Sequence, residues 1–263
     1  MNRQELIRQA KKEILSHKLK AAIYFILRLS VIVIMIAQFL NKNYNNVFIC
    51  VLTLILFMIP SFINKRLDIE LPNTLEIIIL LFIYAAEILG EVGHYYMIYD
   101  RWDDILHTIN GFLFAAVGLA MIDILNSSEK FHFEMAPKFV AMVSFCFSMT
   151  IGVLWEFFEY FMDSFFLMDM QKDTVINRIT SVKFHPEGLN IPVTIDIDSV
   201  VINGIEWAGY IDIGLIDTMV DLFVNFIGAT VFAIFGYFYI KHRGNRKFVE
   251  KFMPKRKKRR KAV

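Results

Sequence analysis

The chain has 263 residues, of which 56% are hydrophobic and 21% are charged, and its formal net charge is only +2. Because the apolar residues are gathered in runs long enough to cross a bilayer, this composition excludes a soluble globular protein and indicates a polytopic membrane protein. The two cysteines, Cys50 and Cys146, both lie inside apolar runs, which excludes a disulfide framework and a thiolate metal site.

The first 20 residues are basic and carry apolar side chains at helical spacing, so we predict a cytoplasmic amphipathic leader over residues 1–20. Six apolar segments follow, each close to the length of about 17–25 residues that a membrane-spanning helix needs. The predicted spans are residues 22–40, 47–63, 75–94, 104–125, 139–165 and 213–240. Residues 21–165 therefore hold the first five membrane helices and residues 213–240 the sixth. The predicted fold class is an all-α polytopic membrane protein with six transmembrane helices.

The distribution of basic residues predicts which side of the membrane each end of the chain faces. An even number of spans places both termini on one side, and the basic leader and the basic tail, residues 241–263, both favour the cytoplasm. In the run Lys255–Lys261 every residue is Lys or Arg. We expect this run to contact anionic lipid headgroups, and we expect no nucleic-acid partner.

Residues 166–212 form the only sizeable polar segment between two spans, and the predicted topology places it outside the cytoplasm. The alternation of polar and apolar residues over 194–198 is typical of a strand. Residues 200–202 and 205–207 flank Asn203 and Gly204, a pair that favours a two-residue type I′ turn. We therefore predict an extracytoplasmic loop that contains a small β-hairpin.

Four of the predicted spans each carry two ionisable side chains about one helical turn apart, which is rare inside a membrane and usually marks a functional site. The pairs are Glu87 with Glu91, Asp104 with His107, Glu156 with Glu159, and Asp217 with Asp221. Residues three or four apart share a helix face, and the predicted topology puts all four pairs in the outer half of the bilayer. The sequence therefore predicts one polar pocket in the outer leaflet. The secondary candidates for residues of this pocket are Glu87, Glu91, His94, Asp103 and Asn225.

Several carboxylates in one pocket cannot all remain ionised without a counter-charge, so either some are protonated or a cation binds. Carboxylate and imidazole ligands together suit Zn, Mn or Fe, whereas carboxylates alone suit Mg or Ca. The candidate metal ligands are Asp104, His107, Glu156, Glu159, Asp217 and Asp221, and the candidate acid–base groups are Glu156, Glu159 and Asp104. The alternative is that acids near helix ends are interfacial caps, an interpretation that is weaker for Glu156, Glu159 and Asp221 because they lie deeper.

Three segments of the chain resemble the YjdF-like family of uncharacterised bacterial inner-membrane proteins. They are residues 99–112 (YDRWDDILHTINGF), residues 152–159 (GVLWEFFE) and residues 217–222 (DTMVDL), the last followed by Asn225 and by Gly228-Ala229. The resemblance implies a bacterial plasma membrane and a multi-helix fold, and it implies no particular activity, substrate or cofactor.

Three functions are compatible with these patterns. The first is a metal-dependent intramembrane enzyme that acts on a lipid or a lipid-linked substrate. The second is a proton- or cation-coupled transporter, because intramembrane carboxylates and imidazoles also serve as relays. The inner halves of the last two spans offer little more than Ser144, Ser148 and Thr150 for such a pathway. The third is a membrane scaffold or assembly factor, for which amide substitution of the acids would be tolerated.

Overall fold

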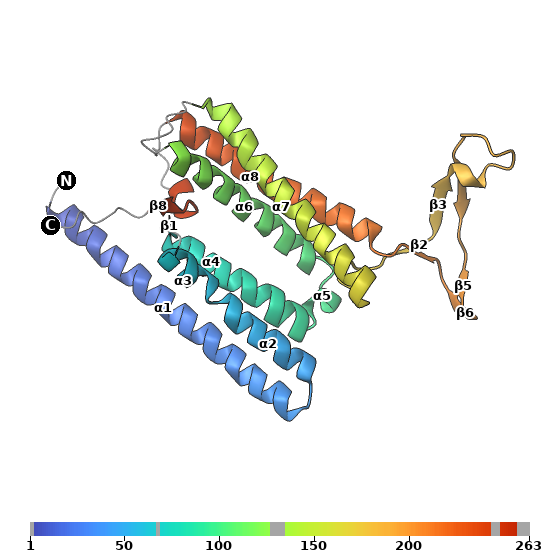
Figure 1. The fold of residues 1–263 in the computed structure, drawn as a ribbon, viewed down its shortest axis with the longest axis horizontal. Coiled ribbons are helices and arrows are strands. Elements are labelled where there is room, and N and C mark those ends of the chain that lie inside the picture. Colours follow the sequence, from blue (N-terminus) through green and yellow to red (C-terminus); the bar gives the residue numbers. More distant parts are fainter. Residues whose placement is uncertain (1–2, 67–68, 127–134, 243–247, 257–263) are drawn as a thin grey trace. The chain divides into compact units, whose positions relative to one another are not determined.

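The computed structural model describes residues 3–66, 69–126, 135–242 and 248–256. The chain divides into two compact units, which are described separately below. The first unit is made of residues 1–150 and 224–263, and the second of residues 151–223. Two long helices, α7 (Pro137–Phe166) and α8 (Leu215–Lys241), contribute to both units (Figure 1).

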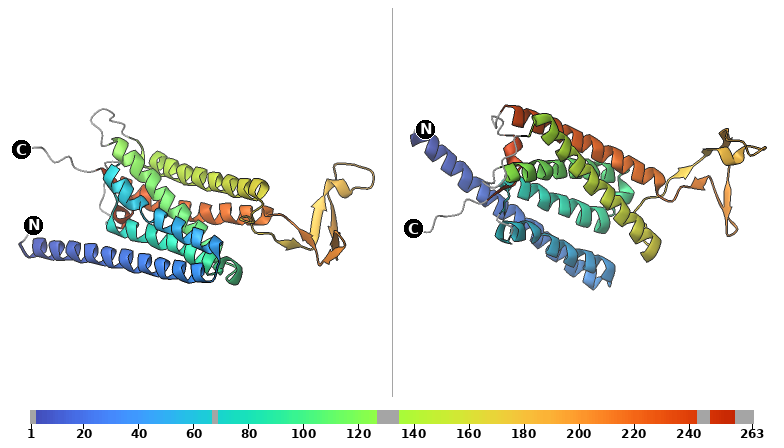
Figure 2. Two further views of the ribbon diagram at one scale, coloured as in Figure 1. Left: turned by 60° about the horizontal axis from the view of Figure 1, so that its bottom comes forward. Right: turned by 45° about the horizontal axis from the view of Figure 1, so that its top comes forward.

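The first unit is helical. Besides parts of α7 and α8 it contains α1 (Arg3–Leu40), α2 (Tyr44–Leu56), α3 (Ile59–Arg66), α4 (Asn73–Ile83), the π-helix η1 (Tyr84–Val92), α5 (Tyr95–Ile98), α6 (Trp102–Asn126) and the short 3-10 helix η3 (Val249–Lys251). The predicted leader and first span form one helix, because α1 continues without a break from Arg3 to Leu40. Its C-terminal part packs along α2 (Figure 2). Leu27, Val31, Cys50 and Phe57 belong to one buried core, which also includes Leu80 of α4 and Ile88 of η1.

Among the described residues, five helical segments are long and apolar enough to cross a membrane. They are Leu15–Leu40, Tyr44–Arg66, Trp102–Asp123, Pro137–Phe166 and Leu215–Lys241. This confirms a helical membrane protein with several spans. The segment predicted as the third span corresponds to α4 and η1, which together run without interruption over residues 73–92 but change from α-helical to π-helical hydrogen bonding at Tyr84. A sixth span therefore remains a prediction.

The predicted second span is broken near its end. Helix α2 ends at Leu56, Phe57 and Met58 form a turn, and α3 starts at Ile59. The cause is Pro60, which has no backbone N–H to donate to a carbonyl one turn earlier. The chain therefore completes this segment as two helices.

Small side chains let α6 approach α7 and α8 closely. The hydroxyl groups of Ser144 and Ser148 on α7 donate hydrogen bonds to the backbone carbonyls of Ala115 and Gly111 on α6, at 2.6 and 2.7 Å. On α8, a Cβ atom added to Gly228 would overlap the carbonyl oxygen of Thr108. Close backbone approach through Gly, Ala and Ser is the usual way in which membrane helices associate.

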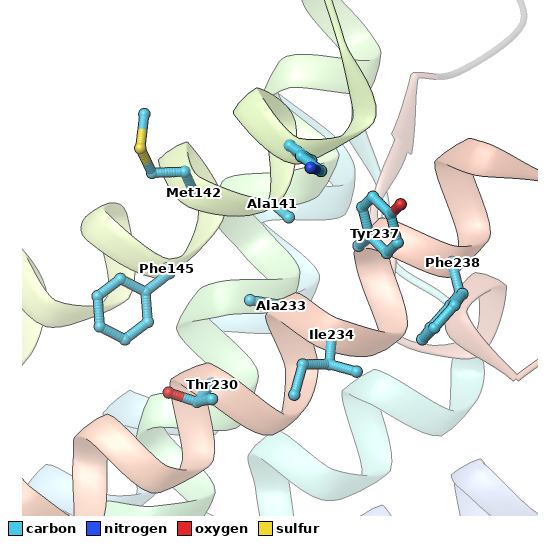
Figure 3. Close-up of a pocket in the computed structure, with 9 residues that line it drawn as sticks. Ala141, Met142, Phe145, Thr230, Ala233, Ile234, Tyr237 and Phe238 are labelled. Carbon is cyan, nitrogen blue, oxygen red and sulfur yellow. The ribbon is translucent and has the colours of Figure 1, made fainter.

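Where α7 and α8 lie alongside each other in the first unit, a groove of about 590 Å³ remains between them (Figure 3). Ala141 on α7 and Ala233 on α8 both line it, and their short side chains leave the space open.

The region around the link between α3 and α4 contacts both α1 and the C-terminal part of the described chain. Strand β1 (Ile69–Glu70) pairs antiparallel with β8 (Lys255–Arg256). Close by in sequence, Val249 and Met253 are buried in the same core as α6 and α8. Lys20 of α1 forms an ion pair with the buried Glu76 of α4. The N-terminal part of α1, the start of α4 and residues 248–256 therefore belong to one end of this unit.

The second unit contains the end of α7, the start of α8 and the polar segment that joins them. This segment holds three antiparallel strand pairs: β2 (Val175–Ile176) with β7 (Tyr210–Ile211), β3 (Arg178–Ser181) with β4 (Val193–Asp196), and β5 (Val200–Ile202) with β6 (Ile205–Trp207). A 3-10 turn, η2 (Val182–Phe184), follows β3. Between β5 and β6, Asn203 and Gly204 have φ angles of 51° and 81°, as a type I′ turn requires, which confirms the predicted hairpin.

Candidate metal centre

Three carboxylates gather inside the second unit, and we call them the acidic cluster: Glu156 and Glu159 on α7, and Asp221 on α8. One oxygen atom from each carboxylate lies within 4.8 Å of one oxygen of both others. All three residues are buried, with exposed fractions of 4%, 6% and 1%. Two apolar helices thus place three acids at one point that water hardly reaches.

The local sequence explains how the cluster forms. Glu156 and Glu159 are three residues apart on α7, so they lie on one face of the helix. The indole Nε1 of Trp155 donates a hydrogen bond of 2.8 Å to Oε1 of Glu159, which fixes the orientation of that carboxylate. Asp221 is in the second turn of α8, a helix whose start is held by other side chains.

Two further carboxylates hold the chain around the start of α8 in place. Asp212 accepts hydrogen bonds from the backbone N–H groups of Gly214 and Ile216, as an N-capping residue does, and also from the N–H of Thr174. Asp163, near the end of α7, accepts hydrogen bonds from the N–H groups of Met170 and Gln171. Neither role is predicted by the local sequence, because a capping residue is expected immediately before a helix and Asp212 lies three residues before Leu215.

The second unit is strongly acidic. Residues 151–223, all of which the structure describes, contain twelve Asp and Glu but only three Lys and Arg. Lys172 pairs with Asp169 at 3.7 Å, Arg178 pairs with Asp196 at 2.6 Å, and Lys183 is exposed. The basic side chains of this unit are thus engaged elsewhere or face solvent. Three buried carboxylates this close cannot all be ionised without a counter-charge, so either some are protonated or a cation binds.

The spacing of the three oxygens suits a single shared cation. Ca²⁺ binds oxygen ligands at about 2.3–2.6 Å and Mg²⁺ at about 2.0–2.1 Å, so two ligands on opposite sides of one ion are about 4–5 Å apart. Carboxylate oxygens are hard ligands that favour Mg²⁺, Ca²⁺ or Mn²⁺. The acidic cluster therefore has the ligand chemistry of a hard divalent cation site.

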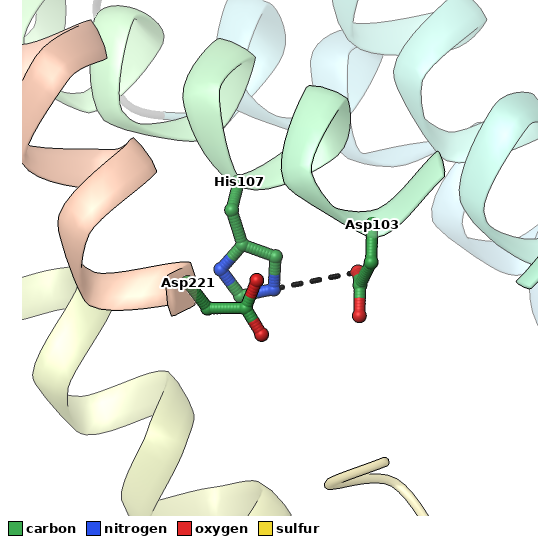
Figure 4. Close-up of side chains that lie close together, drawn as sticks. All are labelled: Asp103, His107 and Asp221. Atoms are coloured by element: carbon green, nitrogen blue, oxygen red, sulfur yellow. Dashed lines mark ion pairs between the residues drawn. The ribbon is translucent and has the colours of Figure 1, made fainter. Parts of the chain in front are cut away.

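The first unit contains the histidine predicted as a ligand. On α6, Nε2 of His107 lies 3.6 Å from Oδ1 of Asp103, one helical turn earlier (Figure 4). His107 is 6% exposed. A carboxylate beside one ring nitrogen orients an imidazole and leaves the other nitrogen for a ligand or a proton, an arrangement that is common for metal-binding histidines.

The remaining predicted ligands have partners of their own. Oδ2 of Asp104 lies 3.0 Å from the guanidinium Nη1 of Arg101, in the first turn of α6, where a carboxylate also stabilises the helix dipole. Oδ2 of Asp217 accepts a 2.8 Å hydrogen bond from the backbone N–H of Lys172. Their roles as metal ligands remain predictions.

The secondary residues lie in the first unit, outside the acidic cluster. Asn225 is buried, and its Nδ2 lies 3.5 Å from Sδ of Met149. Glu87 is half-buried and Glu91 exposed on η1, where π-helical bonding alters the one-turn spacing on which their pairing was predicted. His94 is exposed and has a left-handed φ of 57° before α5.

Comparison with known families gives one match. The model of a family described as predicted membrane protein (DUF2238) matches residues 23–242. No curated protein and no solved structure shows a significant match to the chain. The matched range includes all three residues of the acidic cluster and both residues of the Asp103–His107 pair.

Proposed function

The chain belongs to the family of predicted membrane proteins DUF2238, and on that premise we propose that it is a metal-dependent intramembrane enzyme that acts on a lipid or a lipid-linked substrate. The observation that carries the proposal is the acidic cluster, in which three buried carboxylates from two apolar helices lie within 4.8 Å of one another. A charged side chain inside a membrane costs about 2.5–3.5 kcal/mol on insertion scales. Because the cost is this high, three such groups are expected to lie together only where they bind a ligand.

The acidic cluster supplies the chemistry of a hydrolase or a transferase. A divalent cation held by Glu156, Glu159 and Asp221 would polarise a phosphoryl or carbonyl oxygen or lower the pKa of a bound water. Glu159, whose Oε1 accepts the hydrogen bond from Trp155, is suited to bind the ion, and Glu156 to accept a proton. The three carboxylates alone favour Mg²⁺ or Ca²⁺, whereas a site that also had an imidazole ligand would favour Zn²⁺, Mn²⁺ or Fe²⁺.

The proposed membrane topology has six spans, both termini in the cytoplasm and residues 166–212 outside. It is supported by the contacts of Lys20 in α1 with Glu76 in α4 and of β1 with β8, which bring α1 and the C-terminal part of the described chain to the region of the link between α3 and α4. Lys65 and Arg66 end α3 immediately before that link, and basic residues are common on the cytoplasmic side of membrane helices. A bacterial plasma membrane and the YjdF-like resemblance belong to the same proposal. A cysteine introduced at Asn203 should react with a membrane-impermeant maleimide on intact cells, and protection until lysis would refute this orientation.

The contacts of α7 favour the enzyme over the transporter. A transporter needs polar groups that continue from the site to the other face of the membrane. Ser144 and Ser148 are the buried polar residues in the first half of α7, and both hydroxyl groups donate hydrogen bonds to backbone carbonyls of α6. These hydroxyl groups hold helices together and are not free to bind a moving ion.

Metal binding is the decisive test. Protein purified in detergent should contain a divalent metal or be stabilised by adding one. A ligand at 100 times its dissociation constant stabilises the folded state by about 2.7 kcal/mol. Glu156→Gln, which keeps the size of the side chain, should abolish both the bound metal and the rise in melting temperature. Glu187→Gln is the matched control, because it removes an exposed acid from the same unit.

The proposal fails if the wild-type protein contains no metal and no divalent ion raises its melting temperature. A scaffold would give a different result in cells. Glu156→Gln and Asp221→Asn should then leave intact whatever phenotype is lost on deletion, whereas an enzyme should lose it with either substitution.

A further inference from the structure

The groove between α7 and α8 in the first unit is separate from the acidic cluster and has its own chemistry. It has a volume of about 590 Å³, within the range of about 300–1,000 Å³ that is typical of small-molecule sites. Its walls are formed by apolar side chains such as Phe145, Ile234 and Phe238 (Figure 3). Ala141 of α7 and Ala233 of α8 also line it. An occupant must therefore be apolar along most of its length.

One end of the groove is positively charged. Lys138, in the first turn of α7, is the charged residue among those that line the groove. At the same end Tyr237 lines the groove, and the ammonium group of Lys241, the last residue of α8, lies 5.5 Å from the centre of its ring. Two lysines thus lie at this end of the groove, one at the start of α7 and one at the end of α8.

We propose that this groove binds an anionic phospholipid. One acyl chain lies between α7 and α8, and the phosphate is held by Lys138 and Lys241. In a helical membrane protein an open apolar groove faces lipid chains, so the aliphatic part of the occupant follows from the setting. The headgroup follows from charge, because basic pockets between membrane helices bind anionic headgroups and each nearby Lys or Arg contributes to that attraction. No residue of the acidic cluster takes part, so the proposal is independent of the proposed function.

The test compares two lipids that differ in charge. Full-length protein in neutral detergent is titrated with phosphatidylglycerol or with phosphatidylcholine of the same acyl chains, and bound lipid is counted by native mass spectrometry. The wild-type protein should bind phosphatidylglycerol more tightly than phosphatidylcholine. Lys138→Gln should reduce that preference about fivefold, the factor expected for one basic residue near the headgroup.

Two further variants separate the groove from the rest of the chain. Lys18→Gln removes the same charge from an exposed lysine on α1 that does not line the groove and should leave the preference unchanged. Ala141→Leu fills the groove and should weaken the binding of both lipids, while its melting temperature without added lipid reports whether it folds.

Three results would overturn the proposal. The first is equal binding of the two lipids by the wild-type protein. The second is an equal loss for Lys138→Gln and Lys18→Gln, which would mean diffuse attraction to the whole basic surface. The third is a protein dimer without bound lipid that Ala141→Leu disrupts, which would make a second copy of the chain the occupant.

Discussion

Replacing Gly228 by alanine should separate α6 from α8. The new methyl group would overlap the carbonyl oxygen of Thr108 and come within 2.9 Å of the backbone nitrogen of Phe112. Both atoms belong to the main chain of α6, so neither can move aside by a side-chain rotation. The helices must move apart, and the packing of Ala115 and Phe232 in the core between them must loosen.

Two opposing effects set the size of the change. Alanine is favoured over glycine inside a helix by about 1 kcal/mol. Overpacking a close-packed interior costs about 1–3 kcal/mol, and contact with a rigid backbone belongs at or above the upper end of that range. The expected net loss is about 2 kcal/mol. For a chain of this size that corresponds to a fall in melting temperature of about 4–8 °C.

Gly236→Ala is the matched control, because it makes the same change two turns later on the same helix. There the new methyl group would lie 3.1 Å from Cδ2 of Leu119, the end of a flexible side chain that can rotate away. This variant should be as stable as the wild type or slightly more stable. The assay is the melting temperature of the detergent-solubilised protein, read from the amount that remains monodisperse after heating. Equal effects of the two substitutions, or an unchanged Gly228→Ala protein, would refute the reasoning.

Two further predictions concern a hydroxyl group and a carboxyl group. Ser148→Ala removes the hydrogen bond to the carbonyl of Gly111 and should cost about 0.6 kcal/mol, whereas Thr150→Ala, whose hydroxyl bonds within its own helix, should not lower the melting temperature. In the polar segment outside the spans, burial raises the pKa of Asp173, and Asp169, Asp212 and Asp163 act in the same direction. The folded state therefore binds this proton more tightly than the unfolded state, so the group lowers stability as the pH rises above its ordinary pKa of 3.8. Asp173→Asn should raise the melting temperature more at pH 7 than at pH 4, and an equal shift at both values would contradict this.

Much of the fold follows from local sequence patterns. Apolar runs locate the long helices, since their length and composition alone decide whether they can cross a bilayer. Asn203 and Gly204 specify the hairpin turn because both residues tolerate positive φ. Glu156 and Glu159 are recognisable as a pair on one face of an apolar helix, and their burial agrees with that interpretation.

Other features depend on contacts that no local pattern contains. The change to π-helical bonding at Tyr84 leaves the apolar composition unaltered, so the third span looks like an ordinary helix. The partners of Asp217 and Asp163 are backbone N–H groups of residues 170–172, whose position depends on how the chain turns after α7. The break before Pro60 is different, because the proline itself is a visible signal.

The C-terminal segment contains buried apolar residues next to a strongly basic run. Residues 248–256 precede and enter the most basic run of the chain, which led to the prediction of a tail on the membrane surface. The apolar residues that precede the basic run have a different role: Val249, Phe252 and Met253 are buried in the core of the first unit. The contact of residues 255–261 with lipid headgroups stays a prediction, and residues 257–261 lie outside the described residues. Phe252 also makes an edge-to-face contact with Phe112 on α6.

This arrangement sets an order of events during synthesis. The membrane helices leave the ribosome before residues 248–256 do, so the core among α4, α6 and α8 stays incomplete until those residues have been synthesised. Met253 and its neighbours can then enter the core, and β8 can pair with β1. A chain truncated just after α8 would thus keep all of its membrane helices but lack the side chains that fill this part of the core.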